Sequence, residues 1–137
     1  MIPLYVLATV TGIGLLAGAE WPTAVRYGLA AMLALTASAH FGSRRRDLIA
    51  MVPPRLPRPD LLVTITGVAE LAIAAGLLFE RSAPVAAAAL VVLLVAMFPA
   101  NVHAVRANVG IGGRPPTPLR TRSVIQAAFV AAAIGAL

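Results

Sequence analysis

The sequence predicts an all-α fold, in which a polytopic bundle of membrane-spanning helices forms a single transmembrane domain. Two measures of composition predict it: 60% of the 137 residues are hydrophobic, and the mean hydropathy is +0.91. Soluble domains contain only about 45–50% apolar residues. The third observation is that the apolar residues fall into five runs separated by short polar gaps. A helix of about 20 apolar residues crosses the hydrocarbon core of a bilayer.

The five apolar runs give the expected helices, which cover residues 2–19, 23–41, 61–79, 83–105 and 123–137. The middle three are long enough to cross a bilayer. The last is shorter, so we expect it to be tilted or to end at the membrane interface.

The first segment has two interpretations. Ala17-Gly18-Ala19 resembles the cleavage site of a signal peptide. However, no Lys or Arg precedes the apolar run, and Gly14 and Gly18 have the GxxxG spacing that lets helices approach closely. We favour a retained helix that packs closely and supports a homo-oligomer. The sequence leaves open whether the segment is cleaved.

Charge is distributed unevenly along the chain, whose net charge is +6 and whose eleven basic residues are all arginine. Nine of them lie in two of the gaps between apolar runs: Arg44, Arg45, Arg46, Arg55, Arg58, Arg106, Arg114, Arg120 and Arg122. Positively charged loops stay in the cytoplasm. We therefore expect a multi-pass protein of the bacterial inner membrane, with a cytoplasmic N-terminus and an outside C-terminus. Arginines confined to gaps do not favour a nucleic-acid partner. The absence of cysteine excludes disulfides and thiolate-bound cofactors.

Glu70 is the main candidate for a functional residue, because it lies in the middle of the apolar stretch 61–79. A charge at that depth costs about 2.5–3.5 kcal/mol on insertion scales, and intramembrane acids usually mark function. The other polar side chains expected in the cytoplasmic half of the membrane are Thr36, His40, Thr66, Asn101, His103 and Gln126. This one-sided distribution predicts a single polar pocket that opens toward the cytoplasm.

These polar residues also have structural interpretations. Ser and Thr commonly bond back to their own helix, and Asn101 and Gln126 can hold helices together. Each histidine can equally be structural. No motif spacing joins His40, His103 and Glu70 into a metal site, so we predict none.

Proline shapes two further segments. The run from Pro53 to Pro59 is too rich in proline to be helical, and its apolar neighbours favour a loop folded back under the helices. Pro99 falls inside the fourth expected helix, just before Asn101. It removes one helical hydrogen bond and should kink the helix, which would open a cavity beside Asn101 and His103.

Several of these residues together resemble the DoxX-like family of small bacterial membrane proteins, over roughly Arg26 to the C-terminus. The resemblance is carried by Ala39-His40-Phe41, by the segment 49–59 with its PxxLP loop, by Gly67-Val68-Ala69-Glu70, by Gly76-Leu77-Leu78, and by Met97-Phe98-Pro99-Ala100-Asn101-Val102-His103. It implies a four-helix membrane core, here preceded by an extra N-terminal helix. Named members of that family include a subunit of a thiosulfate:quinone oxidoreductase, and others are linked to oxidative-stress handling. The family is therefore functionally mixed.

Three functions are compatible with this pattern. The first is a redox-linked protein whose cofactor or substrate is a quinone or a similar lipophilic molecule. In it Glu70, His40 and His103 would handle protons, and Asn101, Thr66, Thr36 and Gln126 would bind the substrate. Electrons would come from a redox partner protein or from the substrate, because the chain has no haem motif or nucleotide fingerprint. The second is a cofactor-free acid–base enzyme acting on an apolar substrate. The third is a non-catalytic carrier or assembly protein. Membrane lipid is a partner in each, and the sequence leaves the substrate and the presence of catalysis open.

Overall fold

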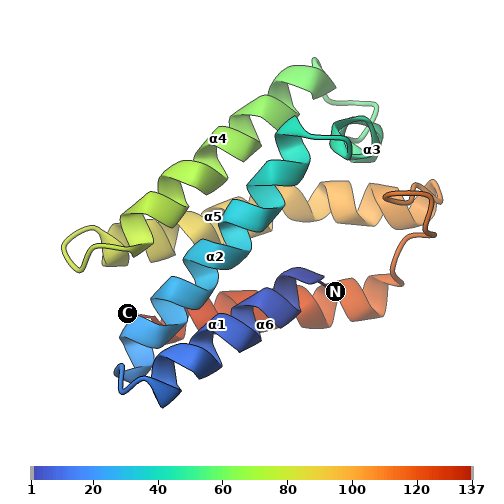
Figure 1. The fold of residues 1–137 in the computed structure, drawn as a ribbon. Coiled ribbons are helices and arrows are strands. Elements are labelled where there is room, and N and C mark those ends of the chain that lie inside the picture. The colour runs from blue at the N-terminus through green and yellow to red at the C-terminus, as the bar shows by residue number, and fades with distance from the viewer. Residues whose placement is uncertain (1, 137) are drawn as a thin grey trace.

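The computed structural model describes residues 2–136, and over this range the chain is helical and contains no strand. This confirms the all-α prediction. The helices are α1 (Ile2–Leu16), α2 (Trp21–Phe41), α3 (Arg45–Met51), α4 (Pro59–Leu77), α5 (Ala83–Arg106) and α6 (Leu119–Gly135). In Figure 1, α2 crosses in front of α5, with α1 beside its first half and α3 beyond its last turn.

Local sequence signals explain where most of these helices begin and end. A proline occupies the first or second position of α2, α4 and α5, where its missing N–H would be unpaired in any case. The α1 helix ends at Leu16, three residues before the expected Ala19. The Gly18 N–H bonds to the Leu15 carbonyl and the Ala19 N–H bonds to the Gly14 carbonyl. With Gly18 at φ +91°, this is the Schellman ending of a helix. Gly18 therefore closes α1 and does not share a helical stripe with Gly14.

Two boundaries differ from the sequence prediction because tertiary packing decides them. The short helix α3 lies in a gap that was expected to be a loop. Its Leu48 and Met51 are three residues apart on one side, and the helix packs against α2, α4 and α5. A helix of this length is stable only when it packs against other elements. The α6 helix begins at Leu119, four residues before the expected Ser123. From Val52 to Arg58 the Pro-rich run is irregular, as predicted.

Two helices of the described chain, α4 and α5, are long and apolar enough to cross a membrane, with mean hydropathies of 1.7 and 2.4 in their most apolar windows. The α1 helix is apolar but has only 15 residues. By contrast, α2 and α6 contain polar and charged side chains such as Arg26 and Gln126. The expected multi-pass topology with five spanning helices is therefore not confirmed. Only 17% of the α5 window is buried, so this helix directs most of its apolar surface outward, including Val85, Val92 and Val95.

The core lies where α2 meets its neighbours. Leu29, Met32, Leu77 and Leu90 are fully buried there, and α2 contacts α1, α4 and α6. Small residues let the helices approach closely. A Cβ atom added at Gly67 would lie only 2.7 Å from the His40 Cβ, so α2 and α4 touch almost backbone to backbone at that level.

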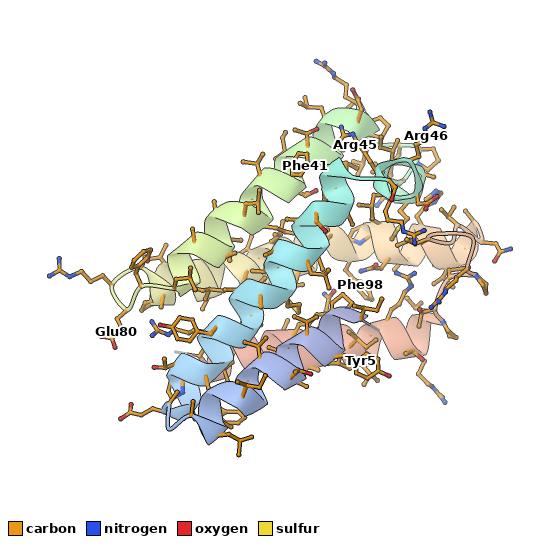
Figure 2. All side chains as sticks on the ribbon, in the orientation of Figure 1. Tyr5, Phe41, Arg45, Arg46, Glu80 and Phe98 are labelled. Carbon is orange, nitrogen blue, oxygen red and sulfur yellow. The ribbon has the colours of Figure 1, made fainter. Side chains whose placement is uncertain are left out.

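The two arginine-rich segments lie together at one end of the molecule. The Asp47 carboxylate of α3 accepts a hydrogen bond of 2.8 Å from the Gly112 N–H, in the segment between α5 and α6, and the Arg44 side chain packs on the same glycine. Figure 2 shows Arg45 and Arg46 at this end and Glu80 at the opposite end of α4. Arg26 is outside these two segments: it lies inside α2 and is only 5% exposed.

Candidate functional site

Glu70 lies in a buried polar cluster that joins α2 to α4. The residue as a whole is 4% exposed, as is His40. The Thr36 hydroxyl lies 2.7 Å from the Glu70 Oε2, and the His40 Nδ1 lies 3.7 Å from the same oxygen. Thr36 and His40 are four residues apart and share one face of α2, and Gly67 on α4 leaves room for that face. The cluster is thus positioned by the Gly67–Glu70 spacing on one helix and the Thr36–His40 spacing on the other.

Hydrogen-bond geometry restricts the protons in this cluster. His40 Nδ1 lies 2.9 Å from the Thr36 backbone carbonyl, which can only accept, so Nδ1 carries a proton and donates it. The other ring nitrogen, Nε2, is left to bind or release a proton.

The Thr36 hydroxyl lies 3.1 Å from the Leu33 carbonyl and 2.7 Å from the Glu70 carboxyl, but it has one hydrogen. Two arrangements satisfy these contacts. Thr36 donates to an ionised Glu70, or a protonated Glu70 donates to Thr36 while Thr36 donates to Leu33. The hydrogen between the Thr36 and Glu70 oxygens can therefore belong to either of them.

Arg45 fastens the end of α2 over this cluster. One guanidinium nitrogen donates to the His40 carbonyl at 2.8 Å. The other donates to the Asp60 carbonyl at 2.9 Å and to the Thr64 hydroxyl at 2.8 Å. Because the first carbonyl belongs to the last turn of α2, a cation there is also favourable for the helix dipole. Arg45 thereby joins the end of α2 to the beginning of α4.

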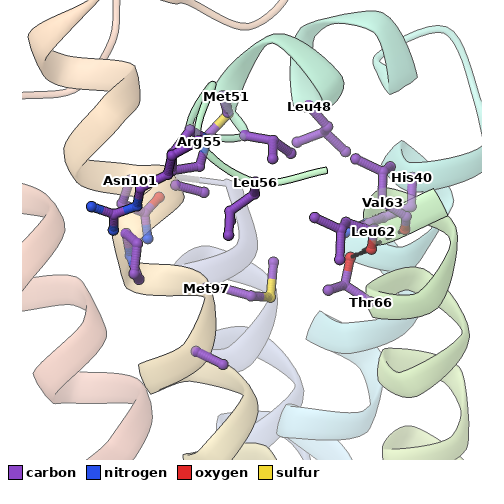
Figure 3. Close-up of a pocket in the computed structure, with 15 residues that line it drawn as sticks. His40, Leu48, Met51, Arg55, Leu56, Leu62, Val63, Thr66, Met97 and Asn101 are labelled. Atoms are coloured by element: carbon purple, nitrogen blue, oxygen red, sulfur yellow. Dashed lines mark hydrogen bonds between the residues drawn. The ribbon is translucent and has the colours of Figure 1, made fainter. Parts of the chain in front are cut away.

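A cavity of about 410 Å³ lies next to the cluster, between α4, α5, α3 and the Pro-rich segment. Figure 3 shows His40 and Thr66 on one wall and Arg55 and Asn101 on the opposite wall. Most of the other lining residues are apolar: Leu62 and Val63 lie beside His40 and Thr66, and the rest include Leu48, Met51, Leu56 and Met97. The cavity is thus polar at two ends and apolar in the middle.

Sequence explains why the helices leave space here. On α5, the residues that line the cavity include Ala96, Pro99 and Ala100, whose side chains are short. The α5 helix continues across Pro99, but proline has no N–H for the carbonyl one turn earlier. On the other side, the Pro-rich segment folds back so that Pro53 and Leu56 form one wall.

The structure brings some of the predicted site residues together and leaves others apart. His40, Thr66 and Asn101 line the cavity. Glu70 and Thr36 do not line it, although both contact His40, which does. Thr66 bonds back to the Leu62 and Val63 carbonyls, as hydroxyls in helices commonly do.

Asn101 is not part of the cluster around Glu70. The Asn101 Oδ1 instead accepts a hydrogen bond of 2.7 Å from Arg122 on α6. Partial burial lowers the pKa of Arg122 from its usual value, although an arginine remains charged at neutral pH. The Asn101 amide therefore joins α5 to α6 while its other side borders the cavity.

His103 and Gln126 do not line the cavity. Residues two apart on a helix do not share a face, so His103 is directed away from the side that carries Asn101. Gln126 belongs to α6, which contributes no residue to the cavity wall. Within residues 2–136, Glu70, His40 and His103 do not gather into a group that could hold a metal ion.

Sequence reasoning missed Arg55 and the apolar wall formed by Leu48, Met51 and Met97. Arg55 was counted only among the arginines that set orientation. The signal that could have found it is its position inside the Pro-rich run, because a loop folded back over the helices brings its side chains against them.

Over residues 2–136, the fold and cavity define a class: an all-helical protein with two helices able to cross a membrane and an apolar pocket next to a largely buried Thr–His–Glu cluster. Residues 29–136 match the family described as a domain of unknown function, DUF8561, and the chain belongs to that family. No curated protein and no solved structure matches the chain.

Proposed function

We propose that this protein is a multi-pass protein of the bacterial inner membrane that binds a lipophilic small molecule, redox-linked and quinone-like, in the cavity beside His40. Its membrane location is supported by the outward-facing apolar residues of α4 and α5, because large exposed apolar surfaces are rare on soluble monomers. The arginine-rich end faces the cytoplasm in this proposal. The resemblance to DoxX-like proteins is part of the same proposal.

The observation that carries the proposal is the arrangement of polar groups around the cavity. His40 lies on one wall and Asn101 on the facing wall, with apolar side chains between them. A quinone has an apolar ring between two carbonyl oxygens, and each oxygen accepts a hydrogen bond. A volume of about 410 Å³ is within the range of small-molecule sites, about 300–1,000 Å³.

In this function His40 is the residue that reaches the bound molecule. Its Nε2 can exchange a proton with a carbonyl or hydroxyl oxygen, while Nδ1 keeps its proton on the Thr36 carbonyl. Glu70 and Thr36 are positioning residues that hold the ring, and the Glu70 carboxylate balances the positive charge of His40 while Nε2 carries the proton to be donated. Reducing a quinone takes two electrons and two protons. The electrons come from a redox partner protein or a second substrate, and the cluster supplies protons.

A second candidate function, acid–base catalysis on an apolar substrate without a cofactor, draws on the same buried cluster. A histidine backed by a carboxyl group is a common general acid–base arrangement. Electron transfer separates the two. Oxidation or reduction of the bound molecule during turnover would support the first function, and isomerisation or hydrolysis without any redox change would support the second. A carrier or assembly role would show binding alone.

The test is binding of 1,4-naphthoquinone to the purified full chain in a neutral detergent, together with mass spectrometry of molecules that co-purify. Ala100→Phe fills the cavity, and Ala88→Phe is the control on the exposed side of the same helix. The proposal requires that the first variant loses binding and the second retains it. Equal binding by both variants, or none by the unaltered chain, would overturn it.

A further inference from the structure

We propose that the molecule bound in this cavity carries an anionic oxygen group, and that Arg55 and Asn101 recognise it. This inference rests on the proposed function and narrows its substrate class. The ligand would have an apolar body that ends in a carboxylate or in the enolate of a hydroxyquinone, which share the same recognition chemistry.

The charge of the cavity wall is the first argument. Among the lining residues the charged side chain is Arg55, and no carboxylate lines the cavity. The acids of this end of the molecule, Asp47 and Asp60, also lie off the wall. Asp47 accepts the Gly112 N–H. A negatively charged group on the ligand is therefore the electrostatic complement of this wall.

The orientation of Asn101 is the second argument. Its Oδ1 accepts the hydrogen bond from Arg122, so the oxygen is occupied on the α6 side. Its Nδ2 makes no hydrogen bond within residues 2–136 and keeps two hydrogens to donate. The wall formed by Asn101 and Arg55 thus presents mainly hydrogen-bond donors. An anionic oxygen group complements such a wall best, because its hydrogen bonds to the donors are charge-assisted, whereas a neutral hydroxyl lacks the charge and an ammonium group has no lone pair to accept with.

In the part of the chain that the structure describes, the opposite wall carries no arginine or lysine that would compete for the anionic group. Thr66 directs its hydroxyl hydrogen to carbonyls of its own helix, and Glu70 does not line the cavity. The apolar body therefore occupies the middle of the cavity, against Met97 and Leu56, with its charged end toward Arg55.

Two matched pairs of probes test the charge preference by calorimetry in neutral detergent. The first pair is 2-hydroxy-1,4-naphthoquinone, an anion at neutral pH, and uncharged 1,4-naphthoquinone. Neither forms a thiol adduct here, because the chain has no cysteine. The second pair is decanoate and methyl decanoate. We expect the anion of at least one pair to bind about tenfold more tightly than its neutral partner, equivalent to about 1.4 kcal/mol.

Arg55→Gln should reduce the affinity for that anion to the level of the neutral partner. Arg46→Gln is the matched control, because Arg46 is exposed at the same end and does not line the cavity. A preference in the first pair alone identifies an acidic quinone, and one in the second alone identifies a carboxylate. Preferences in both identify the shared anionic group.

Neutral partners that bind as tightly as the anions would overturn this inference and leave the proposed function standing. An equal loss in Arg46→Gln would also overturn it, because the preference would then come from general surface charge. If the unaltered chain does not bind 1,4-naphthoquinone, the proposed function itself fails. Circular dichroism of Arg55→Gln checks that the exposed substitution leaves the helices intact.

Discussion

Gly67 on α4 faces His40 on α2 so closely that an added Cβ would lie 2.7 Å from the His40 Cβ. Real Cβ atoms do not approach so near, so only glycine fits there without a shift of the backbone. This contact places the Thr36–His40 face of α2 against Glu70, three residues further along α4. The GxxE pattern therefore has a physical meaning: the glycine admits the partner helix, and the glutamate bonds to it.

Gly67→Ala should destabilise the protein by about 1–3 kcal/mol, because overpacking forces the two helices apart. Gly12→Ala is the control, since a Cβ there meets nothing within 4 Å, and alanine favours helix over glycine by about 1 kcal/mol. Thermal unfolding in detergent measures both. A Gly67→Ala variant as stable as the unaltered chain would contradict the close contact.

Glu70→Gln should fold with nearly unchanged stability, because the amide keeps the shape and can bond to Thr36. Glu70→Ala should lose about 1–3 kcal/mol, since it removes the hydrogen bond with the half-buried Thr36 and the contact with buried His40, and it leaves unfilled space between the helices. Denaturant unfolding compares the two. If the glutamine and alanine variants are equally destabilised, the cluster depends on an ionised carboxylate. If neither is destabilised, it contributes nothing to folding.

Arg45→Ala should destabilise the joint between α2 and α4 by about 1–2 kcal/mol, because three hydrogen bonds from one partly exposed guanidinium are lost. Arg46→Ala removes an equal charge from the neighbouring position and should have little effect. Hydrogen exchange at the end of α2 provides a local measure. Unchanged hydrogen exchange in Arg45→Ala would mean that the Arg45 hydrogen bonds do not stabilise the end of α2.

Gly14→Leu should disturb the packing of α1 on α2, because a Cβ at position 14 already lies 3.2 Å from the Ala24 Cβ. We expect a lower unfolding temperature and an unchanged oligomeric mass in light scattering. If the protein self-associates through Gly14, the variant should instead have a lower oligomeric mass. Gly12→Leu, on the open side of α1, serves as the control.

Topology can be tested with single cysteines, because the natural chain has none. We expect Ser43→Cys and Arg120→Cys, both exposed at the arginine-rich end, to resist a membrane-impermeant maleimide in intact cells. Glu80→Cys, in the turn between α4 and α5, should react. Labelling of the first two from outside would reverse the orientation and place the cavity at the outer half of the membrane.

The sequence by itself determined the helical fold and approximately where the long helices run. Apolar runs of sufficient length and prolines at helix starts are local signals, and they act without knowledge of the partner elements. The same signals do not decide how many helices cross a membrane, because α2 and α6 combine apolar and polar faces. The sequence also identified Glu70, because an acidic residue within an apolar run has a high free-energy cost in a membrane.

Only the tertiary structure decided which polar residues meet. Glu70 pairs with Thr36 and His40 because Gly67 lets α2 approach, whereas Asn101 is taken by Arg122 from α6. The helix α3 and the position of Arg55 on the cavity wall likewise depend on a chain that folds back over α4 and α5. Such contacts join residues far apart in the sequence, and their partners are set by packing between helices, which no local pattern specifies.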